Sequence, residues 1–243
     1  MELLWGLIAG LFNGVGASFI LFKKKYSNNE LNRYLNLAAG VMLAAAFFSL
    51  LKPAYDNLCE YFIDYRAMFV FCGGLIVGYL FLNLLNFIIP HLHDVDSNNV
   101  KHIYMFVLAI ALHKVPEGLA MGIAYANSAE TGQALTLGIL LQNIPEGLSV
   151  ALGLLSVKFS KLKAIVISSL TGLMQPIGML IGLLLGGFGD IFINFCMAMA
   201  GSALLFVVIN EVLPQCYRTH DDVKNSTSLF CGFLVMCILD MLL

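Results

Sequence analysis

Charge is scarce in this sequence. Only 12% of its 243 residues are charged and 60% are hydrophobic, whereas soluble domains average about 25% charged residues. The mean hydropathy of +0.87 is that of a chain lying mostly in a membrane. No basic stripe suited to nucleic acid is present, and the formal net charge is −2. The sequence therefore predicts an all-α integral membrane protein with the lipid bilayer, and no nucleic acid, as a partner.

Closely spaced cysteines and a cleavable leader are also missing. The six cysteines show no CxxC spacing, so we interpret them as small buried residues rather than as redox or zinc ligands. The N-terminus lacks the basic region and the small-residue cleavage site of a signal peptide. We therefore expect the segment that starts at Leu3 to be a permanent membrane span.

About 20 apolar residues cross a bilayer, and eight stretches qualify. They cover roughly residues 3–22, 34–54, 67–90, 101–126, 133–157, 161–187, 191–214 and 226–243. Residues 1–243 therefore form a single polytopic domain of the cell membrane. Most basic residues fall in loops on one side, namely Lys23, Lys24, Lys25, Arg33, Lys101, Lys158, Lys161, Lys163, Arg218 and Lys224, whereas the other side has Lys52 and Arg66. Because basic loops stay in the cytoplasm, both termini are predicted to be extracytoplasmic.

One motif occurs twice within these apolar runs. Residues 113–118 read His-Lys-Val-Pro-Glu-Gly, and residues 142–147 read Gln-Asn-Ile-Pro-Glu-Gly. His113 precedes Glu117 by four positions, as Gln142 precedes Glu146, and such positions share one helix face. Two such helices facing one another would supply a ligand set that suits a first-row divalent cation, zinc foremost.

The position of the motifs favours function over structure. Ionisable groups at mid-membrane are costly and are functional by default, although carboxylates that only lock helices together are the alternative. Pro116 and Pro145 each remove one helical hydrogen bond and are expected to loosen the helix beside the ligands. Three spans precede the motif pair and three follow it, and this 3+2+3 layout is compatible with an inverted repeat.

Other polar and small residues in the spans are less specific. Met42 at its position would normally be a core residue, and Gln175 lies at mid-span beside a proline. His91 and His93 lie in a short loop that either holds metal loosely or is simply solvated. The glycine ridges of several spans allow helices to approach closely, either for static packing or for sliding.

Together these residues resemble the ZIP (Zrt/Irt-like) metal transporters, in particular their bacterial GufA-like branch. The likeness covers nearly the whole chain and includes the paired motif, the Gly-x-Met-Leu-Ala-Ala segment around Met42, the Met-Gln-Pro-Ile-Gly stretch at 174–178 and the Asn-Glu-Val-Leu-Pro stretch at 210–214. It implies transport of a divalent metal into the cytoplasm, typically zinc and otherwise cadmium, iron or manganese. It also implies an elevator-like homodimer, in which spans 1, 4, 5 and 6 (about 3–22 and 101–187) move against a scaffold of spans 2, 3, 7 and 8 (about 34–90 and 191–243).

The resemblance also assigns roles to particular positions. It implies a primary metal site formed by His113, Glu117, Gln142 and Glu146, which Met42 is able to join. By the same resemblance, Ser49 and Asp240 match positions near the outer entrance. Asn210 and Glu211 match a metal-contacting pair on the inner side.

The chain departs from the family at a second metal position. Members of this type can hold a second ion with Asn, Asp and Glu at the positions that here read Lys114, Asn143 and Gln175. An ammonium would repel a nearby divalent ion strongly in a low-dielectric site. We hypothesise that Lys114 replaces the second metal and balances the two motif glutamates, leaving one ion per subunit. The alternative is a lysine on another helix face, paired with a lone carbonyl.

Rival classes fit the sequence less well. An intramembrane metalloprotease would want a His-Glu-x-x-His pair or an equivalent, and His113 has no second histidine within the spans of the motifs. A metal sensor would need a signalling domain. The sequence therefore predicts a transporter rather than an enzyme, with metal as its substrate and no cofactor. A passive metal channel is the alternative that the sequence leaves open.

Overall fold

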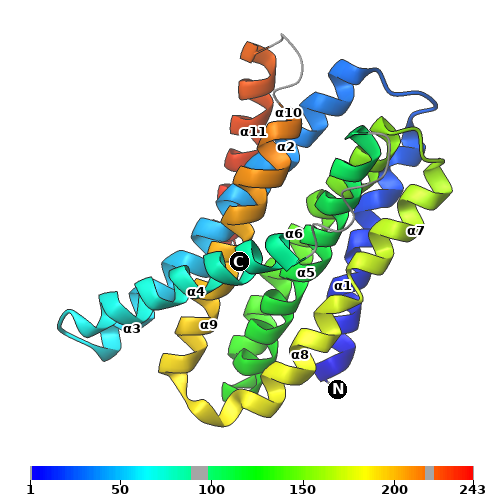
Figure 1. The fold of residues 1–243 in the computed structure, drawn as a ribbon. Coiled ribbons are helices and arrows are strands. Elements are labelled where there is room, and N and C mark those ends of the chain that lie inside the picture. The colour runs from blue at the N-terminus through cyan, green and yellow to red at the C-terminus, as the bar shows by residue number, and fades with distance from the viewer. Residues whose placement is uncertain (1, 89–97, 217–221, 243) are drawn as a thin grey trace.

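The chain folds into long helices that pack side by side (Figure 1). The computed structural model describes residues 2–88, 98–216 and 222–242, and all regular structure in these ranges is helical, which confirms the predicted all-α class. The elements are α1 (Glu2–Ser18), η1 (Phe19–Phe22), α2 (Asn28–Ala45), η2 (Ala46–Leu51), α3 (Lys52–Tyr61), α4 (Arg66–Ile88), α5 (Asn98–Asn127), α6 (Ala129–Ser156), α7 (Lys161–Thr171), α8 (Met174–Leu185), η4 (Gly186–Phe188), α9 (Asp190–Val207), η5 (Val208–Val212), α10 (Leu213–Cys216) and α11 (Asp222–Leu242).

Membrane-length helices match the predicted spans. Within the described residues, 7 segments are long and apolar enough to cross a bilayer: Glu2–Phe22, Asn29–Tyr61, Arg66–Leu84, Ala129–Ser156, Lys161–Leu185, Asp190–Asn210 and Val223–Met241. They correspond to spans 1, 2, 3, 5, 6, 7 and 8. Span 4 falls in α5, several of whose side chains lie outside the described set, so its membrane crossing stays a prediction.

The helices form two groups, which meet along one boundary (Figure 1). In the first group α1 packs on α6 and α7, and α5 packs on α8. In the second group α2 packs on α11, and α9 packs on α3 and α4. The groups touch where α5 lies against α9 and α2 lies against α6.

The packing pairs of the first half of the chain correspond to those of the second half. When span 1 is matched with span 6, span 2 with span 7, span 3 with span 8 and span 4 with span 5, each contact has a counterpart. The α5–α8 contact corresponds to α6–α1, α2–α11 to α9–α4, and α5–α9 to α6–α2.

The last glycine of each motif has the same role. A Cβ on Gly118 would lie 2.0 Å from the Gln175 carbonyl oxygen, and one on Gly147 would lie 2.0 Å from the Asn13 carbonyl oxygen. Each motif helix thus touches its partner backbone to backbone.

Spans 2 and 7 each contain a turn of π-helix, η2 and η5. In both, a proline follows four residues after a residue of that turn: Pro53 follows Ser49, and Pro214 follows Asn210. A proline has no N–H for the carbonyl four positions earlier, and its ring clashes with that carbonyl, so a wider turn is accommodated. The helix of span 2 then continues past its predicted end at 54 to Tyr61, because Pro53 lies in the first turn of α3, where proline is tolerated.

Span 6 is interrupted, although the sequence predicted one continuous stretch. Helices α7 and α8 meet at Gly172 and Leu173. Pro176 has no N–H to offer the Gly172 carbonyl, which accepts the Gln175 N–H at 3.1 Å instead. Helix α1 crosses at this point, since a Cβ on Gly10 would lie 2.2 Å from the Gly172 oxygen. Proline and close packing together break the helix.

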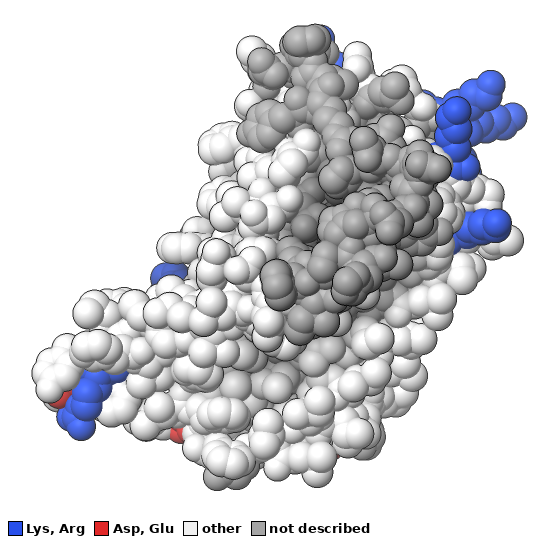
Figure 2. Space-filling model, viewed as in Figure 1, with Lys and Arg blue, Asp and Glu red and all other residues white. Residues whose placement is uncertain are grey.

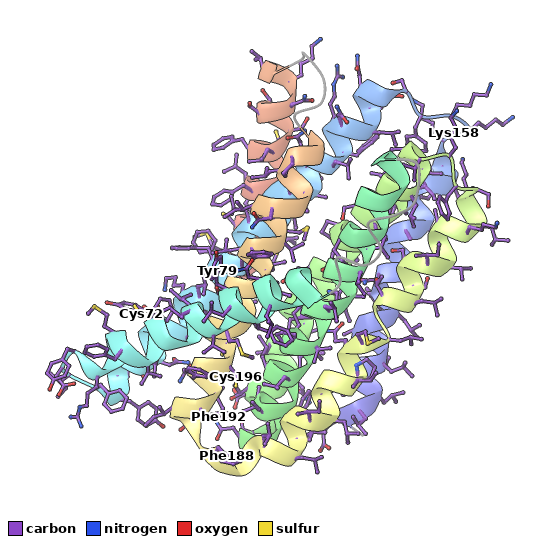
Figure 3. The ribbon with its side chains drawn as sticks, in the orientation of Figure 1. Cys72, Tyr79, Lys158, Phe188, Phe192 and Cys196 are labelled. Atoms are coloured by element: carbon purple, nitrogen blue, oxygen red, sulfur yellow. The ribbon has the colours of Figure 1, made fainter. Side chains whose placement is uncertain are left out.

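The cysteines whose side chains are described are free thiols. The predicted burial is correct for Cys196 on α9 but wrong for Cys59, Cys72 and Cys231, which are exposed; Figure 3 labels Cys72 and Cys196. In a membrane protein the outer surface faces lipid, which accepts a small apolar side chain as readily as the core does. Exposure here is therefore compatible with an inert cysteine.

Candidate metal site

The two motif helices aim their glutamates at one lysine. The Nζ atom of Lys114 lies 2.7 Å from Glu117 Oε2 and 2.6 Å from Glu146 Oε2, and none of the three side chains is exposed. The ammonium also donates to Asn143 Oδ1. The carboxylates of both motif copies therefore converge at one point between α5 and α6. The alternative that places Lys114 on another face, beside a lone carbonyl, is wrong.

Gln142 completes this cluster. Its Nε2 donates to Glu117 Oε1 at 2.8 Å, and its Oε1 is buried without a hydrogen-bond partner among the described residues. A buried amide oxygen without a partner is unfavourable, and an oxygen of this kind is a good ligand for a cation. The described candidate ligands are two carboxylates and one amide oxygen. Among the described side chains, no group of three or more His, Cys, Asp and Glu residues that could hold a metal ion occurs.

His113 lies in α5, one residue before Lys114, and its side chain is outside the described set. Met42 is fully buried in the apolar cluster that also contains Ala17, Ile110 and Val150. This is the core position that the sequence predicted for Met42. Its approach to a metal ion stays a prediction.

The three positions that depart from the family lie in one network. Asn143 Nδ2 donates to the Ala9 carbonyl at 2.7 Å and to Gln175 Oε1 at 2.8 Å. Gln175 Nε2 in turn contacts Met121 Sδ at 3.1 Å. All of these side chains are buried. The network ties α1, α5, α6 and α8 together beside the glutamates.

Sequence reasoning missed Asn13. This residue of α1 has no exposed surface, and its Nδ2 donates to Thr171 Oγ1 of α7 at 3.1 Å. The signal was an amide inside an apolar span, immediately before Gly14. Because Asn13 lies against the backbone of Gly147, it fixes α1 next to the second motif.

A cleft of about 470 Å³ leads toward the glutamates from one end of the molecule. Ser49 and Asp240 both line it, and Ser49 Oγ donates to Asp240 Oδ1 at 2.7 Å. The cleft reaches Gly138 of α6, four residues before Gln142, and a Cβ on Gly138 would meet nothing within 4 Å. The cleft therefore ends about one helical turn from the ligand set.

Further polar residues of this cleft were not singled out from the sequence. Asn57 Nδ2 donates to Asn194 Oδ1 at 3.2 Å, and the Tyr61 hydroxyl donates to Asp190. Glu60 also lines the cleft. They lie near the ends of spans 2 and 7, where polar residues are common, so their positions carried no distinct signal.

The inner-side candidates are less well defined. Asn210 is exposed in η5, and its Nδ2 donates to the Phe206 carbonyl of its own helix at 3.0 Å. The side chain of Glu211 lies outside the described set, as do His91 and His93 altogether. Their predicted roles therefore stay predictions.

Basic side chains gather at one end of the molecule (Figure 2), where Figure 3 labels Lys158. Lys23 pairs with Glu30 there, and the hydrogen bond from this pairing raises the pKa of Lys23 above its ordinary value. The cleft residues belong to α3, the start of α9 and the α5–α6 turn, which lie at the other end (Figure 1).

Membrane-length helices around buried carboxylates, with a polar cleft leading toward them, define a multi-pass membrane protein with a buried polar cluster between its helices. Sequence comparisons agree with this class. The family described as ZIP Zinc transporter matches residues 94–240. The chain is 33% identical to the zinc transporter GufA of Myxococcus xanthus, over 97% of this chain and 96% of the relative. It is 32% identical to the zinc transporter ZIPB of Bordetella bronchiseptica (93% and 76% covered) and 27% identical to the zinc transporter ZupT of Campylobacter jejuni (98% and 94%).

The chain therefore belongs to the ZIP zinc transporter family. Members of this family are transporters of divalent metal rather than enzymes. This confirms the resemblance to the GufA-like branch that the motifs indicated.

Proposed function

We propose that this protein carries a divalent transition metal, zinc foremost and otherwise cadmium, iron or manganese, across the cell membrane into the cytoplasm. The observation that carries the proposal is the convergence of Glu117 and Glu146 on one buried point between α5 and α6. Two carboxylates neutralise a divalent charge that could not otherwise enter hydrocarbon. The zinc transporters GufA and ZIPB are similar over most of the chain.

The proposed primary site holds one ion through His113, Glu117, Gln142 and Glu146, with Met42 able to join. The amide oxygen of Gln142, which is buried and has no hydrogen-bond partner among the described side chains, supports its role as a ligand. Lys114 takes the place of a second ion, since its ammonium already contacts both carboxylates.

The proposed route enters through the cleft at Ser49 and Asp240 and passes Gly138 to reach the site. Release takes place past Asn210 and Glu211, with His91 and His93 near the exit. Most of the basic side chains visible in Figure 2 lie at one end of the molecule, the cleft residues belong to elements at the other end (Figure 1), and basic loops stay in the cytoplasm. This supports an outer position for the cleft and for both termini, and the proposed direction of transport is import.

We further propose eight spans arranged as an inverted repeat, with α5 as span 4. The packing pairs that exchange between the two halves support the repeat. The first group of helices (α1 and α5–α8) corresponds to the predicted transport unit, and the second (α2–α4 and α9–α11) to the scaffold. Movement of one group past the other in a homodimer would be an elevator-like mechanism.

Zinc uptake into proteoliposomes loaded with a zinc-sensitive dye tests this function. We expect saturable flux for the wild type, and loss of flux for His113→Ala and Glu117→Ala. Glu130→Ala, an exposed residue in the first turn of α6, is the matched control and should transport normally. Flux that does not saturate and produces large currents would indicate a channel instead. Wild-type protein that moves none of the four metals would refute the proposal.

A further inference from the structure

Each N–H donor of Lys114 has a partner within the buried polar cluster at the proposed site. An ammonium has three N–H donors and no acceptor, and Lys114 contacts three side-chain oxygens, from Glu117, Glu146 and Asn143. It is fully buried and does not extend toward either membrane surface, as lysines near helix ends do. The cation is therefore a built part of the site.

Among the described side chains, the partners of the ammonium other than the glutamates are neutral. Asn143 is held by the Ala9 carbonyl at 2.7 Å and by Gln175 at 2.8 Å, and these bonds turn its oxygen toward Lys114. Neutral amides add no negative charge to that of the two glutamates, so they suit a single positive charge better than a second divalent ion, which further carboxylates would neutralise. The surroundings are thus fitted to a resident monovalent cation.

The same lysine competes with the transported ion. The Oε2 atoms of Glu117 and Glu146 both bind Lys114, so a metal that binds through these oxygens has to displace the ammonium or share them with it. Without the lysine, an empty site would hold two buried carboxylates without this cation, which is a costly state. With it, both carboxylates keep a cationic partner when no metal is bound.

We propose that Lys114 is a tethered counter-ion that replaces the metal whenever the site is empty. This inference rests on the proposed function and deepens it. As the metal leaves, the ammonium returns to both carboxylates, which weakens metal binding and favours release. The empty transport unit then crosses back without a bound metal. The lysine thus lowers the affinity for the metal and raises the rate of net transport.

The test compares Lys114→Met, which keeps the length and removes the charge, with Lys163→Met on an exposed position of α7. Three quantities are measured on the full-length protein: zinc affinity by calorimetry, net zinc uptake into zinc-free liposomes, and exchange of isotopic zinc across zinc-loaded liposomes. Lys114→Met is expected to bind zinc about tenfold more tightly, equivalent to about 1.4 kcal/mol. It is also expected to lose about tenfold in net uptake while keeping its exchange rate, and Lys163→Met should match the wild type.

Unchanged or weaker zinc affinity in Lys114→Met, or equal losses of net uptake and exchange, would overturn the inference and leave Lys114 a structural ion pair. A second measurement does not depend on the variant folding. In wild-type protein labelled with ¹⁵N-lysine, saturating zinc should shift the Nζ resonance of Lys114, and a Lys114 resonance that does not move overturns the inference as well. Wild-type flux separates the two claims, because flux without these effects refutes only the counter-ion, whereas no flux refutes both.

Discussion

Glu146 is bound to the same ammonium as Glu117, so removing its charge affects both the metal and the lysine. In Glu146→Gln, the proposed site loses one carboxylate ligand, and Lys114 loses one of its two negatively charged partners. We expect zinc affinity to fall by at least the roughly 10- to 100-fold typical of disturbing a residue that supports a metal ligand. Calorimetry and zinc uptake measure the effect. Glu130→Gln on the same helix is the control, and an equal loss in both variants would contradict a site at Glu146.

At this scale the sequence predicted the meeting of the glutamates but not all of their neighbours. The spacing within each motif places its ligand and its glutamate on one face, and the repetition brings two such faces together. That spacing does not fix the direction of Lys114, because a flexible side chain chooses its partner from what surrounds it. Asn13 was missed because its partner, Thr171, lies far away in the chain.

Helix α5 depends on Gly118 for its contact with α8. A Cβ at this position would lie 2.0 Å from the Gln175 carbonyl oxygen, which is backbone and cannot rotate away. Gly118→Ala should therefore push the helices apart at a cost of about 1–3 kcal/mol, although alanine favours an isolated helix by about 1 kcal/mol. Thermal unfolding in detergent should show a lower midpoint and a smaller fraction of active protein.

Gly138→Ala is the matched control, since a Cβ on Gly138 meets nothing within 4 Å. It should be as stable as the wild type or more so. If Gly118→Ala were equally stable, the close α5–α8 contact would not be a constraint on the fold.

Gly138 also tests the route through the cleft. Gly138→Phe fills open space at the end of the cleft, so we expect normal folding but zinc uptake reduced about tenfold or more, since a packed ring leaves no room for a hydrated ion. Gly138→Ala should transport normally. Normal uptake by a folded Gly138→Phe would show that metal reaches Gln142 by another path.

Among the elements, the existence of the spans was predictable and their interruptions were not. Apolar runs long enough for a bilayer identify helices directly. The π-helical turn at Ser49 and the break at Gly172 need more than a proline, because Pro116 and Pro145 lie inside continuous helices. At Gly172 the additional cause is the close crossing of α1 at Gly10, which only the folded chain reveals.

For the whole molecule, charge predicts orientation. The basic end carries Lys24 and the cleft carries Asn57, both exposed. In a cysteine-free background, an impermeant maleimide applied to intact cells should label Asn57→Cys and leave Lys24→Cys unlabelled until the membrane is opened. The reverse pattern would invert the molecule and, with it, the proposed direction of import.

The cleft lies between the two helix groups, so relative movement of the groups should close it. Ala134 of α6 and Asn194 of α9 line it from opposite groups, whereas Asn57 and Asn194 hydrogen-bond within the second group at 3.2 Å. A short bismaleimide that joins Ala134→Cys to Asn194→Cys should therefore abolish net zinc uptake. The same reagent across Asn57→Cys and Asn194→Cys should leave uptake unchanged, because these helices stay together. Transport that survives the first crosslink would exclude rigid movement of one group past the other and would favour local opening around a fixed site.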